Sequence, residues 1–497
     1  MKFTCLTSKI EDLAVDTIVL FSTEISDVKD PLLKRIDRAT RGGLSALLSA
    51  KEFTGKSGEL ATLLKPEGLK CQRVLMVGLG NAKGLSTENF RLAMGTASRA
   101  KGLSGSKTAA VYFDRYGDSR FFQGAVEGYL LGSFKMLEFK SGDAAKNKSQ
   151  LGEIRLVVPE KGLLKKLSDA AHYGEVLAKG QLLVRRLAQI PGNYLTPDIY
   201  AQEAQKLCKQ HGVAIQILDE KTIAREKMNL LLAVSQGSVE PPRFLTLKYN
   251  GARAGQKPIV LVGKGVTFDA GGISLKPPQD MHEMKGDMTG SAIVLAAILC
   301  ASQLKLPVNI VALMPLTENL PSGTALKPGD VITSRKGLTV EIINTDAEGR
   351  LILADALDYA NKFDPQAVVD IATLTGAALY VLGYAGAPIL GNRKGLMDQL
   401  RKAADATGER VWEMPLWDDY KEHMKSSFAD LVNSGGKPAG TLTATAFLSN
   451  FIGDWPWAHI DIAYVDIEPK GKPYTPKGTT GFGLRLLVDM LANWKKL

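Results

Sequence analysis

Short, almost continuously apolar runs separated by helix-like segments constrain the fold of this chain more than any other feature. Three of them, Pro258–Gly263, Val308–Pro315 and Ala367–Ala372, are dominated by valine, isoleucine, leucine and alanine. A strand with one face in water alternates apolar and polar residues, whereas a strand covered on both faces stays apolar. The runs therefore predict an α/β fold with a mixed, mainly parallel central sheet, whose helices include Gly290–Ser302 and Glu348–Phe363.

The 497 residues are enough for more than one domain, and the pattern divides them. Residues 1–165 predict a small N-terminal α/β domain, residues 166–192 a linker helix broken by Pro191-Gly192, and residues 193–497 a larger catalytic α/β domain. In the first domain we expect strands at Ala14–Phe21, Arg73–Val77, Ala109–Phe113 and Ile154–Val158, and helices at Ser86–Ala100 and Gln123–Leu131. In the larger domain we also expect strands at Val213–Leu218, Phe244–Tyr249, Thr339–Ile343 and His459–Ile462, a helix opening at Thr196-Pro197, and a long surface loop over Glu318–Arg335.

Composition narrows the function classes only weakly. The formal net charge of +10 attracts acidic partners, but it is modest when spread over this length. The four cysteines form no CxxC pair, so we expect buried free thiols in a reducing compartment. Without an apolar leader or a run of about eighteen apolar residues, we expect a cytoplasmic protein with no membrane partner.

Two polar stretches interrupt the apolar pattern where predicted strands end and helices begin. Lys264–Asp287 follows one strand, and Asn344–Arg350 follows another. In open α/β sheets, loops beyond the carboxyl ends of the strands converge on ligands. The two stretches contain four carboxylates, two lysines and an arginine: Asp269, Asp287, Asp346, Glu348, Lys264, Lys276 and Arg350. Crowded carboxylates repel one another and desolvate poorly, and a multiply charged cation relieves both effects, so the pattern predicts a two-metal hydrolase site.

Charge suggests a role for each metal-site candidate. Two divalent ions about 3.5–4 Å apart polarise a carbonyl group and generate hydroxide near neutral pH. Asp269 and Glu348 suit bridges between the ions, and Asp287 and Asp346 complete one ion each. Lys264 beside two dications is expected to act as a neutral amine ligand. Four glycines are expected to allow close backbone approach or a positive φ: Gly271, Gly272, Gly286 and Gly349.

The remaining two charged residues suit the reaction itself. Lys276 is expected to stay cationic and stabilise a developing oxyanion, and the forked donors of Arg350 to hold a small anion. Each candidate also has an ordinary explanation, because single aspartates at turns are usually caps or surface groups and Lys276 before two prolines suits a solvated loop. His282-Glu283 lacks the second histidine of an HExxH zinc motif. The joint pattern, and no single member, favours the site.

The same stretches resemble the signatures of the M17 leucyl aminopeptidases, the cytosol aminopeptidase family. The resemblance is carried by NTDAEGR at Asn344–Arg350, VGKGVTFDAGGISLKP at Val262–Pro277 and MKGDM at Met284–Met288. It extends to Pro321-Ser322-Gly323, Pro328–Val331 and Ala372–Ala377, and covers the chain from about residue 190 to its end. The N-terminal third matches only in pattern.

This resemblance implies a hydrolase that removes leucine-like N-terminal residues from short peptides, with two divalent metal ions per subunit (zinc or manganese, with magnesium or cobalt as alternatives). It implies Lys264, Asp269, Asp287 and Glu348 as ligands of the tight site, and Asp269, Asp346 and Glu348 as ligands of the exchangeable one. Lys276 resembles the catalytic lysine, and Arg350 the arginine that holds a bicarbonate acting as general base. Implied substrate-binding positions are Met284, Thr373, Leu374, Gly376 and Ala463. The resemblance also implies a homohexamer.

Several alternatives stay open at the level of sequence. A carboxylate-rich site suits manganese or magnesium at least as well as zinc. Tyr464, where the family often has glycine, and Asp466 depart from the usual pocket sequence, so the ranking of leucine, methionine and arginine substrates is open. DNA is a second possible partner, although no helix-turn-helix pattern or tight basic cluster is present. Nucleotide binding through Gly78–Gly84 is a third hypothesis, disfavoured because the GxGxxG spacing is absent.

Overall fold

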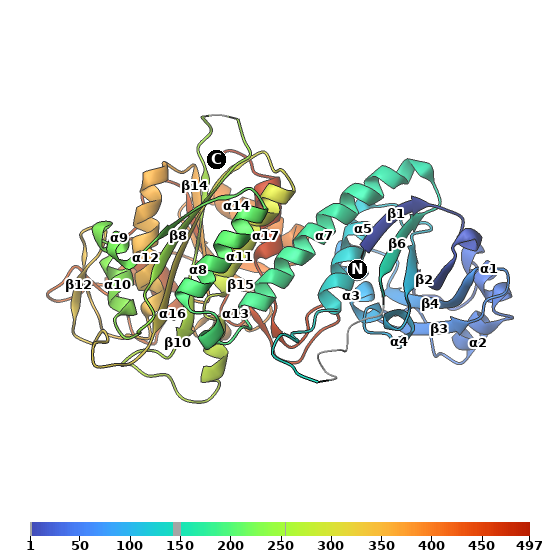
Figure 1. Ribbon diagram of the computed structural model, residues 1–497, viewed down its shortest axis with the longest axis horizontal. Coiled ribbons are helices and arrows are strands. Elements are labelled where there is room, and N and C mark those ends of the chain that lie inside the picture. The colour runs from blue at the N-terminus through green and yellow to red at the C-terminus, as the bar shows by residue number, and fades with distance from the viewer. Residues whose placement is uncertain (1, 143–150, 254) are drawn as a thin grey trace. The chain divides into compact units, whose positions relative to one another are not determined.

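The computed structural model describes residues 2–142, 151–253 and 255–497, which form two compact units (Figure 1). The N-terminal unit contains the chain up to Lys179 together with Lys470–Pro476, and the C-terminal unit contains Gly180–Pro469 and Lys477–Leu497. The boundary between Lys179 and Gly180 falls inside helix α7 (Leu164–Leu187), a continuous helix of 24 residues.

The N-terminal unit is built on a six-stranded sheet in the order β1-β6-β5-β2-β4-β3. Its strands are β1 (Lys2–Thr7), β2 (Val15–Thr23), β3 (Leu60–Leu64), β4 (Cys71–Gly80), β5 (Thr108–Tyr112) and β6 (Glu153–Val158). All pairs are parallel except β3 with β4. Helices α1 (Pro31–Ala39) and α2 (Gly43–Ser49) pack on one face, and α3 (Thr87–Ala97) and α5 (Ser119–Gly132) on the other. The four predicted strands are confirmed, and β1 and β3 were missed because they are short edge strands with few continuous apolar residues.

The C-terminal unit holds a larger sheet in the order β16-β15-β18-β14-β9-β11-β8-β7, with β10 paired to β11. Its strands are β7 (Ala214–Leu218), β8 (Arg243–Asn250), β9 (Ile259–Gly263), β10 (Gly265–Asp269), β11 (Asn309–Asn319), β14 (Ala367–Ala372), β15 (Ala387–Gly391), β16 (Val411–Glu413) and β18 (Trp457–Asp461). The central strands β18, β14, β9 and β11 are mutually parallel. Strand β8 runs antiparallel to β11 and β7, and β15 runs antiparallel to β18 but parallel to β16. The sheet is therefore mixed and mainly parallel, as the apolar runs predicted.

Helices cover both faces of this sheet (Figure 1). On one face lie α8 (Pro197–Gln210), α11 (Thr289–Gln303), α14 (Lys394–Thr407) and α17 (Leu484–Ala492). On the other lie α10 (Asn229–Ser235), α12 (Glu348–Ala360) and α16 (Gly440–Leu448), whose apolar residues share a core with the sheet. Shorter helices in this unit are α9 (Glu220–Arg225), α13 (Ala378–Leu382) and α15 (Asp419–Glu422), and the N-terminal unit contains the short helix α4 (Lys101–Ser104). Helix α8 begins as predicted, with Pro197 in its first turn and Thr196 as its cap.

One segment, Met281–Gln303, is long and apolar enough to cross a membrane by length and composition alone. However, 78% of its most apolar window is buried inside the fold. Every residue from Thr289 to Ala301 is buried, since α11 packs against β9, β11 and β14. This is the environment of a core helix.

Two predictions about the larger domain were confirmed only in part. The expected loop over Glu318–Arg335 begins inside β11, because β10, which the sequence did not predict, pairs with the end of that strand. It also contains β12 (Val331–Thr333). The predicted strand Thr339–Ile343 is only β13 (Thr339–Glu341), and it belongs to a separate small sheet with β12 and β17 (Leu431–Val432). A two-stranded sheet of β19 (Ile467–Glu468) and β20 (Gly478–Thr479) completes the unit.

Candidate active site and metal centre

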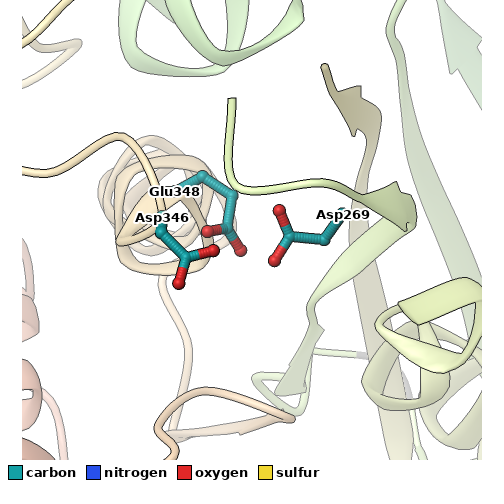
Figure 2. Close-up of side chains that lie close together, drawn as sticks. All are labelled: Asp269, Asp346 and Glu348. Carbon is teal, nitrogen blue, oxygen red and sulfur yellow. The ribbon is translucent and has the colours of Figure 1, made fainter. Parts of the chain in front are cut away.

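The carboxylates singled out from the sequence meet in the C-terminal unit. Asp269 is the last residue of β10, Asp346 lies just before α12, and Glu348 is the first residue of that helix. Figure 2 shows their three carboxylates pointing toward one another. One oxygen from each lies within 4.8 Å of the others, which is the spacing of groups that share a metal ion. Asp287 follows the 3-10 helix Met281–Gly286.

Two lysines connect the four carboxylates. Lys276 Nζ lies 2.8 Å from Asp269 Oδ2 and 2.5 Å from Asp346 Oδ1. Lys264, between β9 and β10, places its Nζ 2.8 Å from both Asp287 Oδ2 and Glu348 Oε1, and it donates to the carbonyl of Thr373 at 2.9 Å. Six of the seven predicted charged residues, all except Arg350, therefore form one connected cluster.

Lys276 and Asp346 are half-buried and the other four members of the cluster are buried, so the charges depend strongly on one another. Burial alone lowers the pKa of Lys264, but the charges of Asp287, Glu348 and Asp269 outweigh it, so the pKa stands above its usual value. The pKa of Lys276 is raised in the same way, chiefly by Asp269 against the effect of burial. Both amines are therefore ammonium groups while these carboxylates are their partners, and a cation that binds the same oxygens competes with them.

The carboxylates respond unequally to this environment. Burial raises the pKa of Asp287, Asp269 and Asp346, and neighbouring carboxylates add to the effect. For Glu348, the two lysines outweigh burial and lower its pKa. Its Oε2 atom is buried and has no hydrogen-bond partner among the described residues. Buried carboxylate oxygens are normally satisfied, so this oxygen fits a group that binds a cation.

Close backbone packing shapes the cluster. A Cβ on Gly349 would lie 2.7 Å from Lys264 Nζ, so any side chain at position 349 would collide with the lysine that contacts the carboxylates. Gly271 has a φ of +88°, and a Cβ there would lie 2.9 Å from Asp346 Oδ1. Gly272 also has a positive φ, whereas Gly286 has neither a positive φ nor a close neighbour, so the prediction for Gly286 was wrong.

Arg350 lies one turn into α12 and is buried. Its Nη1 donates to the carbonyl of Asn433 at 2.8 Å, while its buried Nε has no hydrogen-bond partner in the described part of the chain. Burial lowers the pKa of Arg350 to about 10, which still leaves the guanidinium charged at neutral pH. A buried cation with an unused donor suits a small anion. Asn433, which sequence reasoning missed, also accepts from the amide of Ile343 at 2.8 Å and so holds the start of the Asn344–Arg350 segment.

Four of the five predicted substrate-binding positions follow the ends of β14 and β18, namely Thr373, Leu374, Gly376 and Ala463. Thr373 Oγ1 donates to Asp287 Oδ1 at 2.8 Å, which joins this wall to the carboxylate cluster. The amides of Leu374 and Ala463 both donate to Asp461 Oδ1, at 3.1 and 3.2 Å. Asp461 therefore links the two loops, and the sequence signal that could have found it is a carboxylate at the end of an apolar strand.

Tyr464 occupies an unusual backbone conformation beside this wall. Its φ is +72°, in the left-handed region that favours glycine. Its ring meets that of Tyr384 edge-on, 6.1 Å between centroids, and its hydroxyl lies 3.9 Å from where a Cβ on Gly376 would be. Met284 is half-buried, and its carbonyl accepts from the amide of Asp287 at 3.3 Å, so it belongs to the turn that carries this carboxylate.

A separate cleft lies in the N-terminal unit at the carboxyl ends of β2, β4 and β5. It encloses about 660 Å³, and its lining includes Lys29 and Arg115, which pair with Asp27 and Asp30. The nearby Gly78 and Gly80 do not offer their amides to a phosphate, because they donate to the carbonyls of Glu59 and Gly55. A Cβ on Gly78 would lie 2.0 Å from the carbonyl of Lys56, so packing accounts for this glycine. The contacts favour a plain turn over a nucleotide site.

Comparison with known proteins agrees with the geometry. The catalytic domain of the cytosol aminopeptidase family matches residues 182–488, and its N-terminal domain matches residues 19–143. A probable cytosol aminopeptidase from Syntrophotalea carbinolica is 43% identical over 465 residues, 93% of this chain and 94% of the relative. A solved structure of a tomato leucine aminopeptidase mutant has a TM-score of 0.88 at 31% identity, covering 99% of this chain and 96% of the other. The bottromycin maturation enzyme BotP in complex with Mn has a TM-score of 0.84, also at 31% identity, covering 96% and 99%.

Proposed function

Because the chain belongs to the cytosol aminopeptidase family and is an aminopeptidase, a hydrolase, we propose that it releases leucine-like N-terminal residues from short peptides with two divalent cations. The observation that carries this proposal is the buried cluster in which three carboxylates converge within 4.8 Å. Its unpartnered Glu348 Oε2 and its oxygen-rich donor set fit hard divalent ions.

We assign the cations to Lys264, Asp269, Asp287, Asp346 and Glu348. When bound, two such ions polarise a carbonyl and lower the pKa of water enough to supply a nucleophile near neutral pH. Manganese is supported by the complex of BotP with Mn, and zinc, magnesium and cobalt are alternatives for either position. Lys264 must give up its proton to offer a lone pair, which the approach of two dications favours.

The other residues act on the substrate. Lys276 extends from the loop after β10 to the edge of the cluster, where its ammonium group faces the developing oxyanion of the scissile carbonyl. Arg350 would hold a bicarbonate through the donors that Asn433 does not use, and the bound anion would supply a general base for the attacking water. Thr373, Leu374, Gly376, Ala463 and Met284 form the wall that receives the first side chain of the peptide.

Two parts of the proposal rest on family resemblance alone. We propose that the chain acts in the cytoplasm as a homohexamer whose enclosed active sites admit only short or unfolded peptides. Size-exclusion chromatography with light scattering measures the assembly, and a monomer in solution would contradict this part without touching the chemistry.

The decisive experiment measures hydrolysis of a panel of aminoacyl amides by chelated and remetallated enzyme. We expect chelation to abolish release of the amino acid, and Mn²⁺ or Zn²⁺ to restore it, with leucine amide among the good substrates. Full activity after exhaustive chelation, verified by elemental analysis, would disprove the metal-dependent mechanism. A lack of activity toward every amide, with metal bound, would disprove the substrate class.

A further inference from the structure

Asn319 is the last residue of β11 and is only 4% exposed. It lies directly beside Asp269, because the parallel pairing of β10 with β11 puts these two residues in register. The amide of Ala270 donates to the carbonyl of Asn319 at 2.9 Å, which extends the pairing one residue further. The sequence pattern placed this residue in a surface loop, yet it ends next to the carboxylate cluster.

The side-chain amide of Asn319 makes two hydrogen bonds that bear on the cluster. Its Nδ2 donates to Asp269 Oδ1 at 2.8 Å and to the carbonyl of Thr345 at 3.1 Å. The amide of Gly271 donates to the same Asp269 Oδ1 at 2.9 Å. One oxygen of Asp269 is therefore held by two protein donors, and the other, Oδ2, faces Lys276 and the interior of the cluster.

The second bond reaches the segment that carries the other carboxylates. Thr345 immediately precedes Asp346, and its own hydroxyl donates to the carbonyl of Gly271 at 2.6 Å and accepts from the amide of Ser274 at 2.8 Å. Asn319 thus connects the end of β10 to the loop before α12. The two aspartates come from chain segments that are not paired in any sheet, so side-chain connections hold them together: this one, the Thr345 hydroxyl and Lys276.

We propose that Asn319 is a positioning residue for the metal centre: its amide selects which oxygen of Asp269 faces the cations and sets the separation of Asp269 from Asp346. The proposal rests on the proposed two-cation function. Groups that orient metal ligands in this way change metal affinity by about 10- to 100-fold when they are removed.

Asn319→Leu keeps most of the side-chain volume and removes both donated bonds. Asn309 offers a matched control, since it lies at the opposite end of β11 and also makes two side-chain bonds, accepting from the amide of Ala252 at 3.1 Å and donating to the carbonyl of Gln256 at 2.7 Å. If Asn319→Leu does not fold, Asn319→Ala gives the same comparison without added bulk near Gly272.

The experiment titrates Mn²⁺ into the chelated full-length proteins by isothermal calorimetry and measures the melting of the same chelated samples. We expect the Kd for Mn²⁺ to rise about 10- to 100-fold in the Asn319 variant and to stay at the wild-type value in Asn309→Leu. Equal Mn²⁺ affinity in wild type and Asn319 variants, with lowered melting temperatures in both Asn309 and Asn319 variants, would overturn the inference and leave only a structural role. Failure of the wild type to take up Mn²⁺ or Zn²⁺ would instead overturn the proposed function, and this inference with it.

Discussion

Replacing Lys276 by alanine separates the chemistry of the site from its assembly. The ammonium group of Lys276 lies between Asp269 and Asp346 and does not take part in the sheet or in a helix. Its removal takes one positive charge from a cluster of four carboxylates and leaves the backbone around it unchanged. Lys276→Ala is therefore expected to affect turnover and metal binding in opposite directions.

The expected magnitudes follow from these contacts. Loss of one donor to a developing oxyanion lowers kcat by about 100- to 1,000-fold, or about 3–4 kcal/mol of transition-state stabilisation. A cation near Asp269 and Asp346 is also repelled by the Lys276 ammonium, and two unit charges about 4 Å apart interact by about 4 kcal/mol at an effective dielectric constant of about 20. Removing the lysine relieves part of this repulsion, so metal affinity is expected to stay the same or increase.

The assay compares kcat for leucine amide with metal content in the same samples. Lys336→Ala is a suitable control, because Lys336 also has two oxygen partners, the carbonyls of Asn450 and Ile452, but none in the cluster. We expect the control to keep wild-type turnover. Near-wild-type kcat in Lys276→Ala would remove this residue from the mechanism, and loss of metal from the variant would show that it supports the site and not the reaction.

Three further predictions address other parts of the molecule. Asp287→Ala should lose metal, because it removes a carboxylate that Lys264 and Thr373 hold in the cluster; elemental analysis that finds two ions per chain would refute its role as a ligand. Tyr464→Gly should raise the urea midpoint, because it relieves a backbone conformation that costs about 1–2 kcal/mol in a non-glycine residue. The kcat/KM values of the same variant for leucine, methionine and arginine amides test whether Tyr464 sets the ranking of these substrates. Unchanged ratios would exclude Tyr464 as a specificity residue. Burial alone lowers the pKa of His459, but Asp370, 2.5 Å from its Nδ1, raises the pKa above its usual value. The folded state thus holds this proton more tightly than the unfolded state. The stability that this proton contributes is fully present below the unfolded pKa of about 6.5 and is lost as the pH rises through the folded pKa. In His459→Gln, the urea midpoint should therefore change less with pH over this range.

The fold was predictable where burial leaves a strong pattern. The central strands β9, β11 and β14 are buried on both faces, and their short runs rich in valine and isoleucine favour a strand over a buried helix. Strand β10 was missed because Gly265–Asp269 ends in an aspartate and is separated from β9 by a single charged residue, Lys264. Its pairing with β11 is a long-range contact, which local periodicity does not report.

The candidate site was predictable to the extent that its members are charged residues in two short stretches. We expected these residues to converge because each stretch follows a predicted strand of the central sheet. Asp346 and Glu348 instead follow the small sheet of β12, β13 and β17. Asn319 and Asn433 were missed, because an amide that holds a loop through backbone groups leaves no mark in spacing or composition. Such residues become visible only through the contacts of the folded chain. Asp461 was missed although it ends an apolar strand, which is the position that singled out Asp269.

The packing of the Lys264 side chain against Gly349 affects when the active site forms during synthesis of the chain. The two residues are far apart along the polypeptide, and the lysine also bonds to Thr373, so the groups around it come together only when β9, α12 and the end of β14 have docked. Contacts of such high sequence separation form slowly, after local helices and turns. A chain still leaving the ribosome, with residue 373 inside the exit tunnel, therefore has no hydrolytic activity toward the unfolded peptides around it.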